Sequence, residues 1–312
     1  MHPSYFDPAQ TGHLWLERSA EVATAVQQRQ AAVPRAATDT QRIAVLGIDC
    51  QTGFVTPGAS LQVPGAVGDM NRALDFIYTY AQRLTRLFFS LDTHYAFQIF
   101  HPAFWQDAAG QAPAPFTLIS AADVRAGRWH APTAPTQALA YCEALEREGR
   151  KQLVIWPYHT LLGGISHALV PAVQEAALYH ALLRHSPTRY ILKGEHPWTE
   201  NYSALEPEVK TLGCTVVGDF DAALYTELLT YDRIYLFGEA SSHCVPETVA
   251  SLVRRMQRDA PEAVSRLYLL TDCMSPVPQL PGGPDFPALA EAALAEFAAQ
   301  GVQLVTSAAP RL

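Results

Sequence analysis

Cys244 has the sequence neighbours that a nucleophile needs. It follows an apolar run ending at Gly238 and a turn of small residues, and it precedes an amphipathic stretch at 245–259. These features place the thiol at the amino end of a helix, where free N–H groups and the helix dipole stabilise a thiolate. The same N–H groups could hold an oxyanion. The alternative is a small buried residue that packs the start of the helix.

Asp49 and Lys193 each close an apolar run, so both could lie at the end of a buried strand. An aspartate can take the proton of a thiol, a lysine can stabilise the resulting anion, and a cysteine can attack a carbonyl carbon. With Cys244 they form a set suited to nucleophilic catalysis. Taken singly, Lys193 is better explained as a strand-end lysine that reaches solvent, and Asp49 could be a helix cap or a loop residue.

Asp92 and His94 form a second candidate site. Residues i and i+2 of an extended segment point to the same side, so the carboxylate and the imidazole can face one divalent ion. His101 and His159 are both candidates for a third ligand. Mixed oxygen and nitrogen ligands suit zinc, iron or manganese. A hydrogen-bonded pair at a strand end is the alternative.

The elements that must position these residues alternate along the chain. Near-continuous apolar runs occur at 43–49, 87–92, 153–156, 190–193, 234–238, 267–272 and 302–306. Such runs are typical of strands buried on both faces, as in a parallel sheet. Helical patterns lie between several of them, at 67–83, 167–184, 245–259 and 287–300. The alternation predicts an α/β fold, a three-layer sandwich with a mainly parallel central sheet, whose ligands bind beyond the carboxyl ends of the strands.

Two segments differ from this pattern. Residues 1–41 are predicted to form an N-terminal extension that contains a helix and ends in a linker. Residues 42–312 are predicted to form one domain with an insertion around 105–150, which is rich in alanine and proline and could cover the site. We expect the extension to pack on the domain or on a neighbouring subunit.

The composition narrows the class of protein. Hydrophobic residues make up 49% and charged residues 17%, as in globular proteins. A net charge of -8 argues against a general binder of nucleic acid or of anionic membranes. Five cysteines without a C-x-x-C pair, and no apolar run in the first 30 residues, indicate free thiols and no signal peptide. We therefore expect a soluble cytoplasmic protein.

Six ordered motifs resemble those of the nicotinamidase branch of the isochorismatase-like cysteine hydrolases. They are Ile48-Asp49-Cys-Gln51-Thr-Gly-Phe54 with Pro57-Gly-Ala-Ser-Leu61-Gln-Val-Pro64-Gly65, Asp92-Thr-His94, Trp156-Pro-Tyr-His159, Lys193-Gly194 with Tyr202-Ser-Ala204, Gly238-Glu-Ala-Ser-Ser-His-Cys244-Val, and Thr271-Asp272-Cys-Met-Ser275. They cover roughly residues 42–307. Their shared order makes the resemblance far more specific than any one motif.

The resemblance implies an isochorismatase-like, Rossmann-type topology and a set of site residues. The implied catalytic triad is Asp49, Lys193 and Cys244, and the implied metal ligands are Asp92, His94 and His159. The backbone N–H groups of Ala240 and Cys244 would form the oxyanion hole, next to a cis peptide at Glu239–Ala240. Phe54 and Trp156 match positions that flank the substrate ring in the family, although core packing is the alternative for both.

The resemblance also implies an activity. The expected enzyme is a cysteine-dependent, metal-assisted amidohydrolase of NAD metabolism that converts nicotinamide or a related carboxamide to the acid plus ammonia. It would use one divalent ion, zinc before iron or manganese, and it would form a homo-oligomer. The alternatives are a hydrolase of this fold with a different amide or a vinyl-ether substrate, or a non-catalytic binding protein.

Three departures from the family's pattern leave the substrate open. Thr52-Gly53 replaces an acidic residue, Thr160 stands where nicotinamidases usually have cysteine, and His243 stands where tyrosine is common. The candidate triad is intact. A relative that acts on a different amide is therefore a second expectation.

Overall fold

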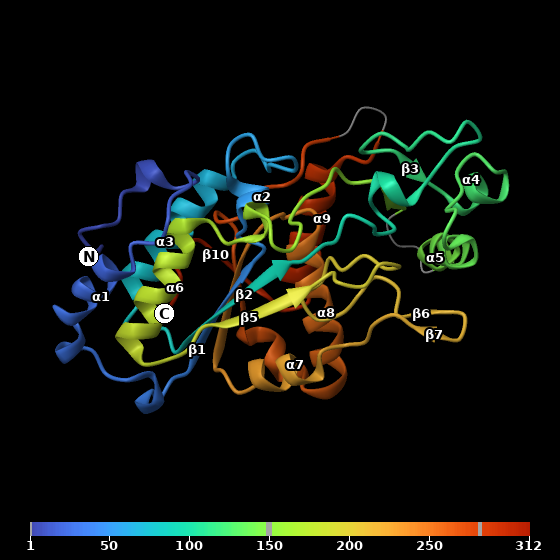
Figure 1. Ribbon diagram of the computed structural model, residues 1–312. Coiled ribbons are helices and arrows are strands. Elements are labelled where there is room, and N and C mark those ends of the chain that lie inside the picture. The colour runs from blue at the N-terminus through green and yellow to red at the C-terminus, as the bar shows by residue number, and fades with distance from the viewer. Residues whose placement is uncertain (1, 148–151, 280–282) are drawn as a thin grey trace.

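A six-stranded parallel sheet forms the centre of the molecule. The computed structural model describes residues 2–147, 152–279 and 283–312 (Figure 1). The strand order is β10-β9-β8-β1-β2-β5, and each neighbouring pair is parallel. The bounds are β1 (Ile43–Ile48), β2 (Arg86–Asp92), β5 (Arg189–Lys193), β8 (Arg233–Gly238), β9 (Leu267–Leu270) and β10 (Gln303–Val305). All six strands lie within or next to predicted apolar runs, and the predicted α/β fold is confirmed.

The register of the sheet brings the carboxyl ends of four adjacent strands to one level. Asp92 at the end of β2 pairs with Lys193 at the end of β5, and Ile48 at the end of β1 pairs with Gly238 at the end of β8. Residues that follow these strands therefore meet at one edge.

Helices cover both faces of the sheet, so the sandwich has three layers. One face packs against α3 (Ala66–Tyr80) and α6 (Pro171–Arg184) in a cluster that includes Val45 and Phe89. The other packs against α7 (Ala222–Leu228) and α8 (Cys244–Asp259) in a cluster that includes Leu46 and Leu236, with α9 (Phe286–Ala299) beside α8. Successive strand residues point to opposite faces, which explains why the runs are apolar throughout.

The predicted helices differ from the observed ones mainly at their ends. The pattern at 167–184 predicted a start four residues before Pro171, where α6 begins. Proline fits the first turn of a helix, because its missing N–H would have no partner there, so it marks the start. Shorter elements are α2 (Thr52–Val55) and the 3-10 turns Pro8–Gln10, Gln30–Ala32, Ala36–Thr38, Pro102–Phe104, Ile165–His167 and Pro261–Arg266.

The apolar run at 153–156 is not a strand of the central sheet, contrary to its pattern. It forms β4 (Leu153–Val154), which pairs antiparallel with β3 (Leu118–Ile119). Both residues of β4 are buried in the cluster shared with α8. Burial on both faces thus comes here from side chains of the insertion and not from a parallel sheet.

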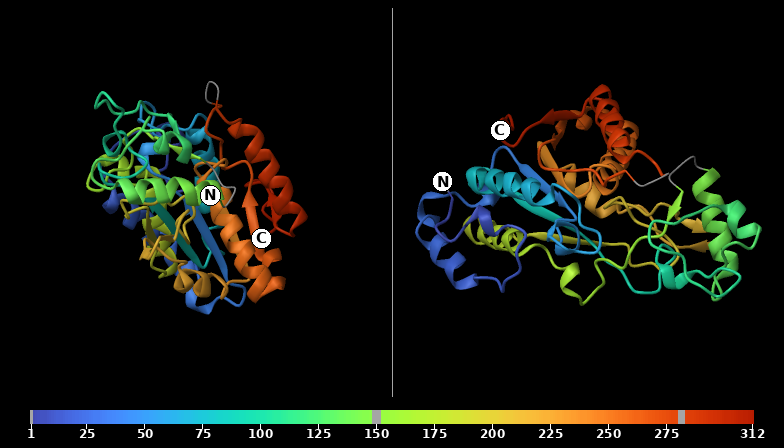
Figure 2. Two further views of the ribbon diagram at one scale, coloured as in Figure 1. Left: turned by 90° about the vertical axis from the view of Figure 1, so that its right-hand side faces the viewer. Right: turned by 90° about the horizontal axis from the view of Figure 1, so that it is seen from above.

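The N-terminal extension and the insertion lie at opposite ends of the molecule (Figures 1 and 2). In the extension, α1 (Ser19–Gln27) packs on α6. The insertion contains α4 (Ala121–Arg125) and α5 (Pro135–Arg147), near a small ribbon of β6 (Thr211–Leu212) and β7 (Thr215–Val216). In the described ranges, no helix has the length and apolar character needed to cross a membrane.

Candidate active site

The ends of β1, β2 and β5 bring three charged side chains together. The Nζ of Lys193 lies 2.9 Å from Oδ2 of Asp49 and 2.8 Å from Oδ1 of Asp92, and it donates a hydrogen bond of 2.8 Å to the carbonyl oxygen of Asn201. It also lies 3.6 Å from Sγ of Cys244, at the start of α8. The structure therefore gathers the three residues of the predicted triad around one ammonium group.

The conformation of Asp49 differs from that of the strand before it. Its φ is +50°, in the left-handed region that non-glycine residues seldom adopt, and such conformations cluster at active sites. Ser90 Oγ donates a hydrogen bond of 2.5 Å to Oδ1 of Asp49 and accepts one of 3.0 Å from its backbone N–H. Sequence reasoning missed Ser90, although it is the polar residue of an otherwise apolar run, two residues before Asp92.

Burial and mutual contact set the charges of this cluster. Burial acts to lower the pKa of Lys193, but Asp49 and Asp92 outweigh it and hold that pKa well above its usual range. Burial acts to raise the pKa of Asp92, but His94 and Lys193 hold it well below its usual range. Lys193 is therefore a cation and Asp92 an anion at neutral pH.

The resting state of Cys244 differs from the thiolate that its helix position favours. Burial raises the pKa of the thiol well above its usual range, although Lys193 opposes the shift. The carboxyl group of Asp49 lies near the thiol and adds to this rise, and burial raises the pKa of Asp49 as well. The arrangement is a neutral thiol beside a carboxylate that can accept its proton.

The loop from β8 to α8 presents two backbone N–H groups beside the thiol. Gly238 has a φ of +128°, and a Cβ there would lie 2.0 Å from the carbonyl oxygen of Ile48, so only glycine fits. The next peptide, Glu239–Ala240, is cis, as predicted. The N–H groups of Ala240 and Cys244 donate no hydrogen bond to any residue that the structure describes. They are available for a developing oxyanion.

Asp92, His94 and His159 form a buried cluster that fits a divalent ion. Their ligand atoms lie within 4.8 Å of one another, with His94 Nε2 2.9 Å and His159 Nε2 3.6 Å from Oδ2 of Asp92. The Nδ1 of His94 lies 3.2 Å from the carbonyl oxygen of Gly194, and that of His159 lies 2.7 Å from the carbonyl oxygen of Pro157. Backbone contacts at Nδ1 fix the rings and leave both Nε2 atoms facing the carboxylate, an arrangement typical of metal-binding histidines.

His101, the other sequence candidate, lies beside this cluster and not in it. Its ring centroid is 5.7 Å from those of both His94 and His159, and its Nδ1 lies 3.0 Å from the carbonyl oxygen of Tyr95. Burial lowers its pKa to about 3, so the ring is neutral at physiological pH. The geometry favours His159 over His101 as the third ligand.

Two residues near the strand ends, Gln51 and Gly194, fix the positions of the candidate metal ligands. Gln51 brackets Asp92: its Nε2 donates to the carbonyl oxygen of Asp92 and its Oε1 accepts from the N–H of Asp92, at 2.9 and 2.7 Å. At Gly194 the φ is +87°, and a Cβ would lie 2.7 Å from His94 Cε1. The two hydrogen bonds of Gln51 and the lack of a side chain at Gly194 therefore determine where the candidate ligands lie.

A small cavity of about 40 Å³ opens beside Cys244. Phe54 and Trp156, the predicted ring-flanking residues, both line it, together with Tyr202. The indole N–H of Trp156 donates a hydrogen bond of 3.2 Å to the Tyr202 hydroxyl. Glu200, which no sequence motif indicated, also lines the cavity.

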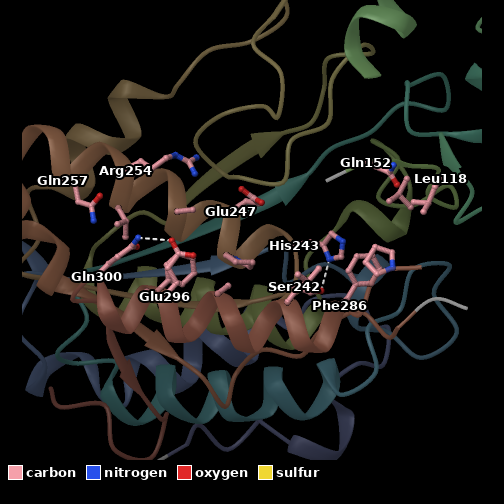
Figure 3. Close-up of a pocket in the computed structure, with 18 residues that line it drawn as sticks. Leu118, Gln152, Ser242, His243, Glu247, Arg254, Gln257, Phe286, Glu296 and Gln300 are labelled. Carbon is pink, nitrogen blue, oxygen red and sulfur yellow. Dashed lines mark hydrogen bonds between the residues drawn. The ribbon is translucent and has the colours of Figure 1, made fainter. Parts of the chain in front are cut away.

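A much larger groove of about 730 Å³ runs between α8 and α9 (Figure 3). It meets the small cavity at His243, which lines both and packs edge to face against Phe286 at 4.6 Å between ring centroids. His243 is also the residue that departs from the family motif. The substitution of histidine for the family's tyrosine at position 243 therefore lies where the small cavity and the groove adjoin.

Comparison with solved structures agrees with the fold expected from the sequence. The chain is similar to a nicotinamidase/pyrazinamidase from Acinetobacter baumanii, with a TM-score of 0.54 and 21% identity over 87% of this chain and 99% of that one. It is also similar to a yeast nicotinamidase bound to the inhibitor nicotinaldehyde, with a TM-score of 0.55 and 18% identity over 85% and 99% of the two chains. The chain thus has the fold of the nicotinamidases. No family model and no curated protein matches the sequence.

Proposed function

We propose that the chain is a cysteine-dependent, metal-assisted amidohydrolase that converts nicotinamide or a related carboxamide to the acid plus ammonia. One observation carries the proposal: Lys193 bridges Asp49 and Asp92 while its Nζ lies 3.6 Å from Sγ of Cys244. A nucleophile, a base and a fixed cation thereby share one buried site beside a cavity.

The chemistry follows from the positions of these groups. Asp49 takes the proton of the Cys244 thiol, and the thiolate attacks the amide carbon. The N–H groups of Ala240 and Cys244 stabilise the oxyanion of the tetrahedral intermediate. Asp49 then returns its proton to the amide nitrogen, ammonia leaves, and a thioester remains. Water, deprotonated by Asp49, hydrolyses the thioester to the acid and regenerates the thiol.

Lys193 has an electrostatic role in this sequence. Its charge opposes the rise in the pKa of both Asp49 and Cys244 that burial causes. It therefore keeps the proton transfer between them within reach, because it stabilises whichever of the two groups is anionic.

Asp92, His94 and His159 would hold the divalent ion, and zinc, iron and manganese all suit this ligand set. When bound, the ion would supply a positive centre for a heteroatom of the substrate. Phe54 and Trp156 would then hold the ring of the substrate between apolar surfaces. The ring centroid of Phe54 lies 5.6 Å from that of His159. The small volume of the cavity favours a compact carboxamide.

The remaining expectations from the sequence form part of the proposal. Residues 42–312 would be the catalytic domain of a cytoplasmic homo-oligomer that acts in NAD metabolism, with 1–41 as an extension and 105–150 as an insertion. The departures at Thr160 and His243 favour testing amides other than nicotinamide as well.

An ammonia-release assay over a panel of aromatic and aliphatic amides tests the proposal. We expect release from nicotinamide or from a close analogue, and none from the same amide with the Cys244→Ala variant. Intact, metal-loaded protein that releases ammonia from no amide would overturn the proposal.

A further inference from the structure

Glu200 has an unusual place in the cavity beside Cys244. The residue is 4% exposed, and it lines that cavity together with Asp92 and His159. Its Oε2 has no hydrogen-bond partner among the residues that the structure describes. A buried carboxyl oxygen without a partner is costly, so its presence in a functional cavity calls for a ligand outside the chain.

The backbone of Glu200 is fixed by contacts from two sides. Its N–H donates a hydrogen bond of 3.2 Å to the hydroxyl of Tyr141, which is buried in α5 of the insertion. Its carbonyl oxygen accepts one of 2.8 Å from the N–H of Glu208. The backbone that carries this carboxyl group is therefore fixed beside the cavity.

Carboxyl groups are concentrated around the cavity. Asp92, Glu200 and Glu239 line the cavity, and the ammonium group of Lys193 is held between Asp92 and Asp49. A divalent ion in the cavity would stabilise the ionised forms of these carboxyl groups. Burial raises the pKa of Glu200 to about 8, with His94 and Lys193 opposing the rise and Asp92 adding to it. The groups that act on Glu200 thus include two of the metal cluster and Lys193 of the triad, together with Glu208, which adds to the rise.

We propose that Glu200 is a positioning residue of the metal centre, which stabilises a divalent ion held by Asp92, His94 and His159 from outside the ligand set. Its carboxylate would supply negative charge beside the ion. The inference rests on the metal site of the proposed function and not on the identity of the amide. It also gives the insertion a role, because Tyr141 of α5 holds the backbone of Glu200.

The test measures the affinity for Zn²⁺ without substrate, by competition with a chromogenic chelator. Glu200→Gln removes the charge and keeps the shape. We expect it to bind Zn²⁺ about 10–100-fold more weakly than the wild type, the usual loss when a residue that supports metal ligands is changed. Co²⁺-loaded protein should show a shifted visible absorption spectrum as a second readout.

Glu206→Gln is the matched control. Glu206 is a nearby buried glutamate, but it pairs with Arg254 at 3.0 Å, accepts a hydrogen bond of 2.7 Å from Ser251, and does not line the cavity. The same chemical change there should leave Zn²⁺ affinity within about twofold of the wild type, since its charge lies outside the metal centre.

Wild-type Zn²⁺ affinity in Glu200→Gln would overturn the proposal. If that variant kept its affinity but lost kcat/KM for amides, Glu200 would contact the substrate and not support the metal. Should Glu200→Gln fail to fold, Glu200→Ala, which leaves room for water, must show the same loss of affinity. A wild-type chain that binds no divalent ion would instead refute the metal site of the proposed function.

Discussion

The central sheet has one buried charge cluster at the amino ends of its strands, called the amino edge here, and another at their carboxyl ends, called the carboxyl edge. The two clusters differ in how their polar atoms are used. At the amino edge, Arg184 is fully buried and its guanidinium group donates to Asp39, at 2.6 Å to Oδ2, and to the carbonyl oxygens of Pro34 and Leu84, at 2.6 and 3.2 Å. At the carboxyl edge, Lys193 is shared between two carboxylates and lies beside a thiol.

The difference lies in what surrounds each pair. Around the metal cluster, three atoms are buried without hydrogen-bond partners in the part of the chain that the structure describes: Glu200 Oε2, Thr160 Oγ1 and His101 Nε2. At the amino edge, Asp39 also accepts a hydrogen bond of 2.6 Å from Thr85, and Nδ1 of His180 beside Arg184 is buried without a hydrogen-bond partner among the described residues. A buried ion pair alone therefore does not mark a functional site. At the carboxyl edge, Glu200 with its unpartnered oxygen lines a cavity that Cys244 also lines, and this combination marks the candidate site.

Removal of the Cys244 thiol should have the largest effect at the carboxyl edge. Cys244→Ala should reduce amide turnover by on the order of 10⁴-fold or more, because the nucleophile is lost while the small side chain still packs. Cys142→Ala, which changes a buried cysteine of α5 away from the cavity, should keep turnover. Steady-state ammonia release and thermal melts measure both variants. Wild-type turnover in Cys244→Ala would show that the thioester mechanism is wrong.

The metal cluster gives the next largest effect. His159→Ala should lose its bound metal, because it removes one of three protein ligands, and it should weaken the binding of pyridine carboxamides. His101→Ala should retain the metal, because its ring lies outside the ligand set. Metal analysis of the purified variants decides. Full occupancy in His159→Ala together with none in His101→Ala would reverse the ligand assignment.

The amino edge should respond in stability and not in turnover. Asp39→Ala leaves the fully buried Arg184 without its anion and should lower the free energy of unfolding by about 3–5 kcal/mol. Turnover per folded molecule should stay within about twofold of the wild type, because the two clusters lie at opposite ends of the strands. Denaturant unfolding and active-site titration separate the two effects. A loss of turnover without a loss of stability would contradict the contrast drawn here.

A smaller, pH-dependent effect is expected where the N-terminal extension meets α6. Burial acts to raise the pKa of Glu175, but hydrogen bonds from Arg18 and Trp15 outweigh it and lower that pKa below 4.5. Its contribution to stability is therefore complete above about pH 4.5 and is lost as pH falls through the lowered value. Glu175→Gln should cost about 1.5–3 kcal/mol at pH 7. Unfolding curves recorded down to pH 3 should show the difference from wild type shrinking, and a constant difference would refute the assignment.

Much of the fold could be predicted from the sequence, because strands buried on both faces have near-continuous apolar patterns. The run at 153–156 shows the limit of this reasoning: an insertion can bury both faces of a short segment as well as a sheet can. The end of a helix is clearer where a residue such as Pro171 restricts the backbone, and ambiguous elsewhere.

Some residues of the candidate site could be predicted from the sequence and others could not. Asp49, Asp92 and Lys193 could be predicted to meet because each ends a strand of one parallel sheet. Glu200 could not, because its place depends on a contact with Tyr141, 59 residues away in the chain. The neutral state of the Cys244 thiol could not be predicted from the sequence either. Burial is a property of the whole fold, and its effect on the pKa of the thiol outweighs that of the helix position.

Gly194 has a consequence for any attempt to evolve this chain toward new substrates. Its φ of +87° disfavours every residue with a side chain, and the space for a Cβ is already taken by His94 Cε1 at 2.7 Å and by Asp92 Oδ1 at 3.2 Å. A library randomised at this codon and selected for metal-dependent turnover should return glycine whatever amide is offered. Codons for Trp156 and His243, whose side chains line the cavity, are where such a library can find diversity.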